Sequence, residues 1–413
     1  MSKRKTLSRF DVAIVGGGIS GTTFAAILGG AGLSVALIER QAQAALEKSA
    51  YDGRTTAITY GSRKLLEAAG LWDDLAPDAC PIDDIRVADG ASSLFLHFDS
   101  REVGNDPLGS ILENRVIRKS LHKRINAIKT VTQIAPATVA GLDTSGPLAY
   151  LTLEDGRQIA ADLVVGADGR ESFIRGAAGI GTIGWAYKQH AIVTVMGHEL
   201  PHENVAVENF LPAGPFAILP MTDAPDGTHR SSIVWTDHVD AVPLYAKLDR
   251  PAFEAELQKR AGEWLGRVWE IGPRFTYPLQ LRHAKRYIAP RVALIADAAH
   301  VIHPIAGQGL NLGMRDIDLL SELLVDHRRS GLDLGDPLML RRYERARRTD
   351  NFAFSATTDI LDRLFSNDIP PIRAARRIGL GAVNSMPPLR RFFMRRAMGA
   401  SGALSRLGRG ESL

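Results

Sequence analysis

Cysteine is almost absent from this 413-residue sequence: Cys80 is the single one, so no intramolecular disulfide can form. The sequence also lacks an uninterrupted apolar run long enough for a membrane-spanning helix, because its first apolar stretch is broken at residues 16–18 by three glycines. That stretch has no small-residue cleavage site of the kind that ends a signal peptide. These absences predict a cytoplasmic protein without a transmembrane helix.

Negative charge is scarce at the C-terminus. The whole chain has a formal net charge of +4, but residues 369–413 hold nine arginines, no lysine and a single acid, Glu411. This segment therefore carries +8, and the rest of the chain carries −4. No recognisable fold or interleaved aromatic platform accompanies the arginines, which argues against nucleic-acid binding.

The basic segment also has an apolar stripe. At helical spacing, Leu389, Phe392, Phe393 and Ala397 share one face, with arginines around it. Such a segment can rest on an anionic membrane, which would make the protein peripheral at the inner face of the cytoplasmic membrane. The alternative is a helix that packs on the body or on a partner and leaves its arginines solvated.

Three segments near the N-terminus predict a βαβ unit. Residues 11–15 and 34–38 are short apolar, β-branched runs typical of buried strands, and residues 19–28 predict a helix rich in small side chains. Two strands joined in this way are parallel and belong to one sheet. The pattern of a buried strand returns at residues 162–165 and 291–295.

A glycine fingerprint lies between the first strand and the helix. Gly16 permits a tight turn, Gly18 leaves room for a pyrophosphate, and Gly21 lets the helix approach the strand. The helix N-terminus offers free N–H groups to the phosphates. Glu39 ends the next strand, where a carboxylate accepts hydrogen bonds from ribose hydroxyls and repels a 2′-phosphate. The pattern predicts a site for FAD or NAD; the alternative is a glycine-rich turn beside a solvated Glu39.

Two later turns identify the cofactor by resemblance. Residues 166–172 (GADGRES) follow one buried strand, and residues 296–300 (ADAAH) follow another and continue through Pro304 to residues 307–313 (GQGLNLG). With the N-terminal glycines, they resemble the three flavin motifs of the class A flavoprotein aromatic hydroxylases, in order and over nearly the whole chain. The family's usual Gly-Asp pair in the third motif is Ala296-Asp297 here.

Shorter segments resemble one branch of that family, the ubiquinone-biosynthesis hydroxylases of the 2-octaprenylphenol and 2-octaprenyl-6-methoxyphenol type. These segments are residues 51–58, 113–118, 214–220, 232–235 and 386–394.

The resemblance implies a set of cofactor contacts. Asp297 would meet the ribityl or pyrophosphate region, residues 307–313 would lie against the isoalloxazine ring, and Asp168 would lie near the pyrophosphate and the nicotinamide approach. The predicted cofactor site comprises Gly16, Gly18, Ile19, Ser20, Gly21, Glu39, Arg40, Arg54, Arg118, Asp168, Gly169, Asp297, Pro304, Gly307, Gln308, Gly309, Leu310 and Asn311. The predicted substrate pocket comprises Phe216, Leu219 and Trp235.

Each of these sets has a plainer alternative. Arg54 and Arg118 could be surface arginines, and Phe216 and Trp235 could be core aromatics. His300 and His303 have a spacing seen in metal sites, but Pro304 indicates a loop, so packing or hydrogen bonding is the interpretation and no metal is predicted. Cys80 has no CxxC partner and predicts a buried thiol.

The expected fold is α/β: an FAD-binding Rossmann-like domain of the glutathione reductase type, with an inserted, mostly antiparallel β domain for the substrate. The predicted FAD domain is discontinuous and comprises residues 1–75, 105–180 and 286–365. Residues 76–104 and 181–285 form the β-rich domain, and residues 366–413 form the basic C-terminal segment.

The function that the resemblance implies is an FAD-dependent monooxygenase that hydroxylates the ring of a polyprenylated phenol in ubiquinone biosynthesis. NAD(P)H would bind transiently, since no second glycine fingerprint exists, and O₂ would react to form a flavin C4a-hydroperoxide. No catalytic residue is assigned, because the cofactor carries most of this chemistry. The alternatives are a hydroxylase of a small soluble aromatic, a prenyl-chain reductase, and a scaffold in a quinone-biosynthesis complex.

Overall fold

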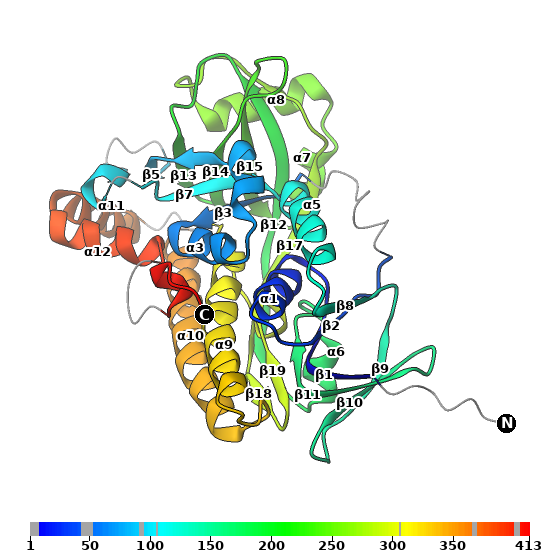
Figure 1. Cartoon of the computed structure of the whole chain (residues 1–413). Helices are drawn as coiled ribbons and strands as arrows, with labels where there is room; N and C mark the ends of the chain where they lie inside the picture. Colours follow the sequence, from blue (N-terminus) through cyan, green and yellow to red (C-terminus); the bar gives the residue numbers. More distant parts are fainter. Residues whose placement is uncertain are drawn as a thin grey trace.

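The computed structural model describes residues 8–42, 53–90, 95–104, 106–304, 307–365, 370–399 and 405–413. Two large sheets stand one above the other, with helices α9 and α10 running along the side of the lower sheet (Figure 1). This arrangement confirms the predicted fold class.

The lower sheet, sheet A, is the nucleotide-binding type of sheet that the βαβ pattern predicts. Its strands are β1 (Ser8–Val15), β2 (Val35–Ile38), β8 (Val131–Ile134), β9 (Val139–Asp143), β10 (Ala149–Leu153), β11 (Gln158–Gly166), β18 (Ile288–Ala289) and β19 (Val292–Leu294). The order β19-β11-β1-β2-β8 is parallel throughout, and β9, β10 and β18 add antiparallel pairs.

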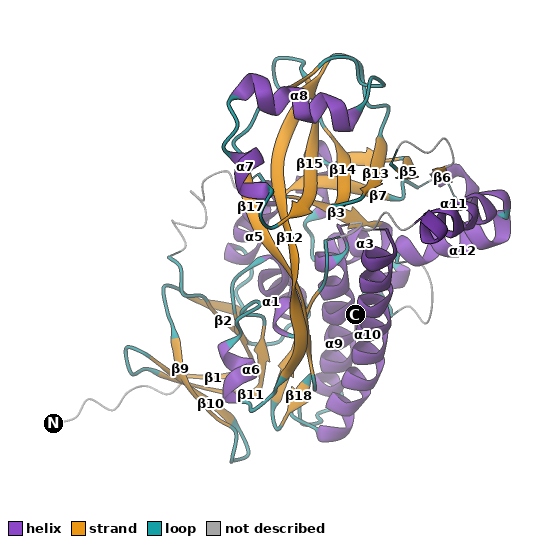
Figure 2. Cartoon of the chain, turned by 180° about the vertical axis from the view of Figure 1, so that it is seen from behind, coloured by secondary structure: helices purple, strands orange, loops and turns teal. Residues whose placement is uncertain are grey.

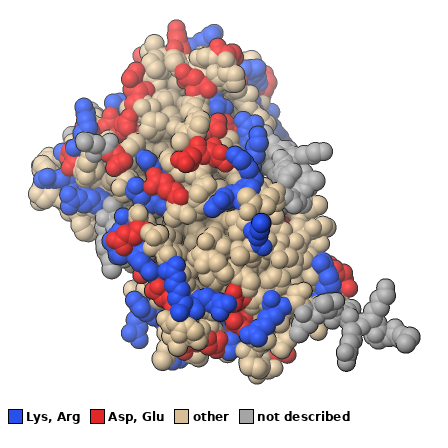
Figure 3. Space-filling view, viewed as in Figure 1, with Lys and Arg blue, Asp and Glu red and all other residues tan. Residues whose placement is uncertain are grey.

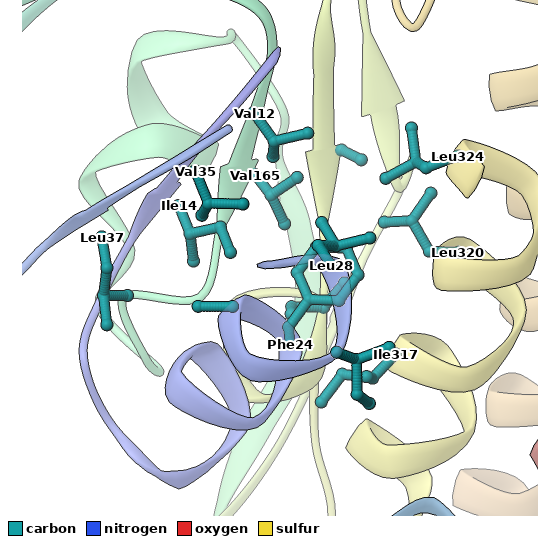
Figure 4. Close-up of a cluster of buried hydrophobic side chains, with 14 of the residues drawn as sticks. Val12, Ile14, Phe24, Leu28, Val35, Leu37, Val165, Ile317, Leu320 and Leu324 are labelled. Carbon is teal, nitrogen blue, oxygen red and sulfur yellow. The ribbon is translucent and has the colours of Figure 1, made fainter. Parts of the chain in front are cut away.

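Helices pack around sheet A and share one apolar core with it. They are α1 (Ile19–Gly30), α3 (Tyr60–Ala68), α4 (Trp72–Leu75), α5 (Asn114–Asn126), α6 (Phe173–Ala177), α9 (Gly309–Arg329) and α10 (Pro337–Phe365). Figure 4 shows Phe24 and Leu28 of α1 between the strands and the α9 side chains Ile317, Leu320 and Leu324. These α9 residues lie on the apolar stripe that the sequence predicts, and burying each such side chain contributes about 1.5–3 kcal/mol.

The upper sheet, sheet C, is mostly antiparallel. Its strands are β5 (Asp84–Asp89), β6 (Phe95–Asp99), β12 (Thr182–His198), β13 (Val205–Leu211), β14 (Gly214–Met221), β15 (His229–His238), β16 (Val268–Glu270), β17 (Phe275–Ala284) and β20 (His300–Val301). The order is β20-β17-β12-β15-β14-β13-β5-β6, and the β13–β5 pair is parallel.

Sheet C has two different faces. The face that we call outer is covered by α7 (Val242–Ala246) and α8 (Arg250–Ala261), and Figure 2 shows α8 lying across it. The opposite, inner face is turned toward sheet A and a small sheet B. Sheet B consists of β3 (Thr55–Thr59), β4 (Cys80–Ile82) and β7 (Gly109–Glu113). In sheet B, β3 and β7 come from the predicted FAD domain and β4 comes from the predicted β-rich domain. The predicted domain boundaries therefore stay a prediction.

The C-terminal segment packs on sheet C. It forms α11 (Pro370–Ser385), α12 (Pro387–Ala397) and the 3₁₀ turn Leu407–Arg409 (η5). Other 3₁₀ turns in the chain are Ala76–Asp78 (η1), Ser100–Glu102 (η2) and Ala296–Ala298 (η3). Arg376 of α11 pairs with Asp89 at 2.7 Å, and both side chains are buried. Arg390 of α12 pairs with Glu102 at 2.7 Å. Acids of the body therefore neutralise these two arginines of the segment.

Candidate cofactor site

The three glycine–acid turns of the sequence meet at one edge of sheet A. They follow β1, β11 and β19, which are adjacent parallel strands whose ends are in register at Val15, Gly166 and Leu294. Parallel strands point their carboxyl ends the same way, so the turns after them must lie together. The positions separated by hundreds of residues in the sequence thus build one site.

The first turn shows why two of its glycines are required. Gly16 has φ 110°, and a Cβ there would lie 2.3 Å from the carbonyl oxygen of Ala167 in the second motif. A Cβ on Gly21 would lie 1.9 Å from the carbonyl oxygen of Gly16. At Gly18, by contrast, a Cβ would meet no atom within 4 Å. Close packing within the protein requires glycine at positions 16 and 21, whereas the protein leaves open space at Gly18, as the predicted pyrophosphate contact requires.

Glu39 stabilises this turn through two hydrogen bonds. Its carboxylate accepts the N–H of Gly17 at 2.7 Å and that of Gln41 at 2.8 Å, and the next residue, Arg40, is exposed. Helix α1 begins at Ile19 with Gly18 as its N-cap and has no side-chain cap, so the first-turn N–H groups, including that of Ser20, have no partner within the helix. A helix end of this kind attracts phosphate.

In the second turn, Asp168 holds its own loop. Its carboxylate accepts the hydroxyl of Ser172 at 2.5 Å and the N–H of Ile174 at 3.0 Å, which fixes the start of α6. Gly169 has φ 82°, a left-handed conformation that favours glycine. Asp168 is half-buried. Its contact with a pyrophosphate stays a prediction, and the hydrogen bonds show a structural role in addition.

The third turn takes the left-handed conformation despite its alanine. Ala296, which replaces the glycine of the resembling family, has φ 51°. The adjacent Asp297 is exposed at the edge of the site, although protein atoms surround most of it. This crowding raises the pKa of Asp297, while the charges of His300, Arg170 and Arg54 lower it. The carboxylate is positioned to accept hydrogen bonds from hydroxyl groups.

A buried acid, Asp316 of α9, holds the third turn in place. One carboxylate oxygen accepts the N–H of Ala296 at 3.1 Å and contacts His300 Nε2 at 2.6 Å. The other accepts Arg347 Nε and Asn351 Nδ2 of α10, each at 2.9 Å. Burial by itself raises the pKa of Asp316, but the charges of His300 and Arg347 and the hydrogen bonds from His300 and Asn351 outweigh it and hold that pKa at about 2.

The glycine loop before α9 lies against β3. Gly307 has φ 61°, and a Cβ there would be 3.3 Å from that of Ala57. Asn311 donates to the Ala57 carbonyl at 2.7 Å, and Gly309 has open space in front of it. Gln308 is buried, and its Oε1 has no hydrogen-bond partner within the described part of the chain. Pro304 and Leu310 are half-buried beside this loop, while residues 305–306 lie outside the described residues.

Of the two predicted arginines, Arg54 is close enough to the third turn for its charge to lower the pKa of Asp297. Arg54 is exposed, with its guanidinium carbon 5.7 Å from the centre of the Tyr277 ring. Arg118 is half-buried on α5, which packs on α1. Their contacts with a cofactor stay predictions.

These residues fit FAD. A helix N-terminus suits the pyrophosphate, carboxylates at the strand ends suit hydroxyl groups, and the buried Oε1 of Gln308 suits an N–H of the flavin ring. The fit depends on atoms of the protein whose hydrogen-bonding capacity the chain itself leaves unused.

The three predicted pocket residues do not lie on one face. Phe216 and Trp235 are fully buried in the outer-face cluster under α8, where the Arg260 guanidinium carbon lies 3.8 Å from the centre of the indole ring. Leu219 lies on the inner face. The geometry gives Phe216 and Trp235 a packing role, so we retain only Leu219 for the pocket.

Sequence reasoning missed Asp316 and the acid Glu208 of β13. Neither belongs to a recognised motif. The usable signal for Glu208 is that it alternates with the apolar residues Ala206 and Phe210 of one strand, so that it must share their face.

The two histidines after the third turn make ordinary side-chain contacts. His300 contacts Asp316, and His303 Nε2 lies 3.3 Å from Gln189 Oε1. Across the described ranges, no group of three or more His, Cys, Asp or Glu has the geometry to hold a metal ion. Cys80 is buried, and that burial raises the pKa of its thiol to about 12.

Comparison with known proteins agrees with this geometry. The FAD binding domain family model matches residues 9–351. Ubiquinone hydroxylase UbiL of Rhodospirillum rubrum is 49% identical over 94% of this chain and 89% of its own length. The 3-demethoxyubiquinol 3-hydroxylase of Escherichia coli is 34% identical over 94% of this chain and 98% of its own length.

Solved structures share the fold. The p-nitrophenol 4-monooxygenase PnpA of Pseudomonas putida superimposes with a TM-score of 0.78 at 18% identity, over 96% of this chain and 100% of that one. The probable FAD-dependent monooxygenase PqsL of Pseudomonas aeruginosa gives 0.76 at 22% identity, over 90% and 99%. The predicted family and the predicted FAD cofactor are confirmed: this chain belongs to the FAD binding domain family, together with the ubiquinone hydroxylases.

Proposed function

We propose that this protein is an FAD-dependent monooxygenase that hydroxylates the aromatic ring of a polyprenylated phenol in ubiquinone biosynthesis. The observation that carries the proposal is the meeting of three flavin-type turns at one edge of sheet A, in a chain whose similarity to ubiquinone hydroxylases covers nearly its full length.

The chain's own residues bind and orient the cofactor. The N-terminus of α1 binds the pyrophosphate, Glu39 accepts from the ribose, and Asp297 accepts from the ribityl chain. The N-terminus of α9 directs its positive dipole end at the flavin ring, where it stabilises negative charge. FAD, when bound, takes electrons from NAD(P)H and activates O₂ for transfer of one oxygen atom to the ring.

The inner face of sheet C is the place for the substrate ring. Leu219 and Val234 belong to inner strands of this large sheet yet are only half-buried, so their face is not fully filled by side chains. The face is next to the flavin loop, because Thr55 of β3 donates to Ser232 at 2.9 Å and Ala57 of β3 contacts that loop. A ring held here lies beside the flavin and away from bulk water, as oxygen transfer requires.

The function is tested by anaerobic reduction with NAD(P)H, followed by oxygen, with a prenylated phenol present. We expect hydroxylated product. Reoxidation that yields only hydrogen peroxide, with every quinone precursor tried, would reject the function. Oxygen-independent turnover would favour a prenyl-chain reductase instead.

A pair of glycine variants tests the cofactor site itself. Gly18→Val adds a side chain where the protein has no atom within 4 Å, so the fold should survive and FAD binding should fall at least tenfold. Gly30→Ala is the matched control, because Gly30 ends the same helix and also has open space. Retention of bound FAD by Gly18→Val would contradict the proposed site.

The location of the substrate leads to a second part of the proposal. Phe392 and Phe393 of α12 are 55% and 42% exposed, with Arg391 and Arg395 exposed beside them. Figure 3 shows basic side chains among uncharged surface on this projecting unit. Aromatic rings beside arginines suit the interface of an anionic membrane, where a polyprenylated phenol dissolves. No helix within the described ranges is both long and apolar enough to cross that membrane.

Point variants test this contact better than truncation does. Met394 and Met398 are buried in the body, so removing the segment would open the core. The double variant Phe392→Ser with Phe393→Ser should reduce co-sedimentation with phosphatidylglycerol vesicles, whereas Phe352→Ser, an exposed phenylalanine of α10, should not. Unchanged co-sedimentation of the double variant would contradict a membrane contact.

A further inference from the structure

The inner face of sheet C holds one acid that no interaction explains. Glu208 lies on β13 between Ala206 and Phe210, both of which pack in apolar clusters of the inner face. The registers of the adjacent strands place Val87 and Ala217 directly beside it. Among the described residues, Glu208 has no hydrogen bond and no ion pair.

Glu208 lies on the face of sheet C that we propose for the substrate, since it alternates with the inward residues Ala206 and Phe210. Protein atoms surround the carboxylate, and this desolvation raises its pKa to about 7. The residue is half-buried, so part of its surface stays accessible to a substrate on this face.

Paired strands connect Glu208 to the flavin loop. Ala217, the neighbour of Glu208, pairs with Val234, and two residues along the strand Leu219 pairs with Ser232. Ser232 contacts β3 and, through it, the loop before α9. Ser232 and Glu208 are two strands apart, at about 4.8 Å per strand, and two residues apart along the strands, at about 3.3 Å per residue. Because these displacements are at right angles, the two positions are about 12 Å apart. A phenol bound on this face between Ser232 and Glu208 would have the flavin loop toward one end and the carboxylate toward the other.

We propose that Glu208 is the catalytic acid–base residue that exchanges the phenolic proton of the substrate during hydroxylation. This rests on the function proposed above and assigns a residue to a step that the cofactor does not perform.

The proton balance is as follows. The phenol O–H bond breaks, its proton moves to the Glu208 carboxylate, and the electron pair stays on the phenolate oxygen, which makes the ring a better nucleophile toward the oxygen atom that FAD and O₂ supply. When the hydroxylated ring becomes aromatic again, its C–H proton passes to the second oxygen atom of O₂, which leaves as water, and the ring oxygen recovers a proton from the Glu208 carboxyl. The residue is thereby regenerated. A base whose pKa is near the working pH is the most effective for such a transfer.

The charged groups on the elements around this face are already paired. They are Asp89 with Arg376, Glu102 with Arg390, Glu113 with Arg230, and Asp362 with His303. Each pair offsets its own charge, and none contributes to the shift at Glu208, whose cause is burial alone. Among the described residues, Glu208 is therefore the acid of this face that has no charged partner.

The test compares wild type, Glu208→Gln and Glu263→Gln in the holoenzyme, with a prenylated phenol and NAD(P)H over about pH 5.5–8.5. Glu263 is an exposed acid of the same domain. The wild-type hydroxylation rate should rise with pH through about 7, because the carboxylate must be ionised to accept a proton. Glu208→Gln should lose this rise and fall about 100-fold at pH 8, with FAD content and flavin reduction unchanged. Glu263→Gln should behave as wild type.

A second substrate separates acid–base chemistry from positioning. A ring-fluorinated prenylphenol ionises more readily, so it should restore part of the rate in Glu208→Gln; a structural role predicts no such recovery. A flat wild-type pH profile, or a Glu208→Gln profile equal to wild type, would overturn the proposal. Those results differ from failure of the function itself, in which wild type forms no hydroxylated product at all.

Discussion

Asp316 and Glu208 are both acids that the fold surrounds with protein, yet burial has opposite results for them. Asp316, behind the third flavin turn, contacts His300, Arg347 and Asn351, and its pKa is held at about 2. Glu208, on the inner face of sheet C, contacts none of the described charged groups, and its pKa rises to about 7. Desolvation acts on both; only partners can reverse it.

The difference distinguishes an acid that stabilises the fold from an acid that can exchange a proton with a substrate. A carboxylate that is fully hydrogen-bonded holds the backbone around it and cannot change its proton near neutral pH. A carboxylate without partners costs stability when ionised but is able to exchange a proton where the substrate binds. Within this chain, the acid that stabilises the cofactor cradle is therefore not the acid that serves the reaction.

The largest expected effect comes from removing the partnered acid. Asp316→Asn removes the buried carboxylate partner of Arg347 and leaves it only the more accessible Asp350, so the free energy of unfolding should fall by about 3 kcal/mol at pH 7. The contribution of a lowered pKa is present above the ordinary carboxyl pKa and is lost as the pH falls toward about 2, so the difference should shrink in acid. Chemical denaturation measures it. Asp333→Asn, which removes an exposed ion pair with Arg291, should cost under about 1 kcal/mol, and an equal cost for both variants would remove the distinction.

The unpartnered acid should give the reverse sign. Because the folded-state pKa of Glu208 is raised, its ionisation destabilises the fold as the pH rises from about 4.5 through about 7. Glu208→Gln should be more stable than wild type by about 1–2 kcal/mol at pH 8, after allowance for partial exposure, and equal to it near pH 4.5. Thermal unfolding at the two pH values measures this. A glutamine variant that is less stable at pH 8 would indicate a partner for the carboxylate.

The smallest effect concerns the turn that Asp316 holds. Ala296 keeps φ 51°, which costs an alanine about 1 kcal/mol and a glycine almost nothing. Ala296→Gly should therefore gain about 0.5 kcal/mol after the added flexibility of the unfolded chain is subtracted. Ala299→Gly, where φ is −94°, should lose a similar amount. If both variants are destabilised, the left-handed turn is not strained.

Much of the cofactor domain was predictable because its requirements are local. Gly16 and Gly21 are read directly from the sequence, since each must omit a side chain beside a specific backbone atom. The stripe through Ile317 and Leu320 of α9 also follows from helical spacing alone. The convergence of the three turns follows once their strands are recognised as parallel.

The substrate face was not predictable in the same way. Alternation shows that Trp235 and Val234 lie on opposite faces, but only the position of α8 decides which face is filled. No sequence motif marks Asp316 as important. Its role depends on partners in α10 and the third turn, which are distant from it in the sequence. The C-terminal arginines were assigned to solvent or to a membrane, whereas Arg376 finds its acid on β5, about 290 residues earlier in the chain. Such pairings depend on long-range geometry that composition does not contain.

The parallel strands that carry the flavin turns have an evolutionary consequence. Because β1, β11 and β19 align the turns through backbone pairing, the length and sequence of the chain between them are free to diverge. A solved structure with 18% identity therefore shares the fold of this chain, although little of the sequence is the same.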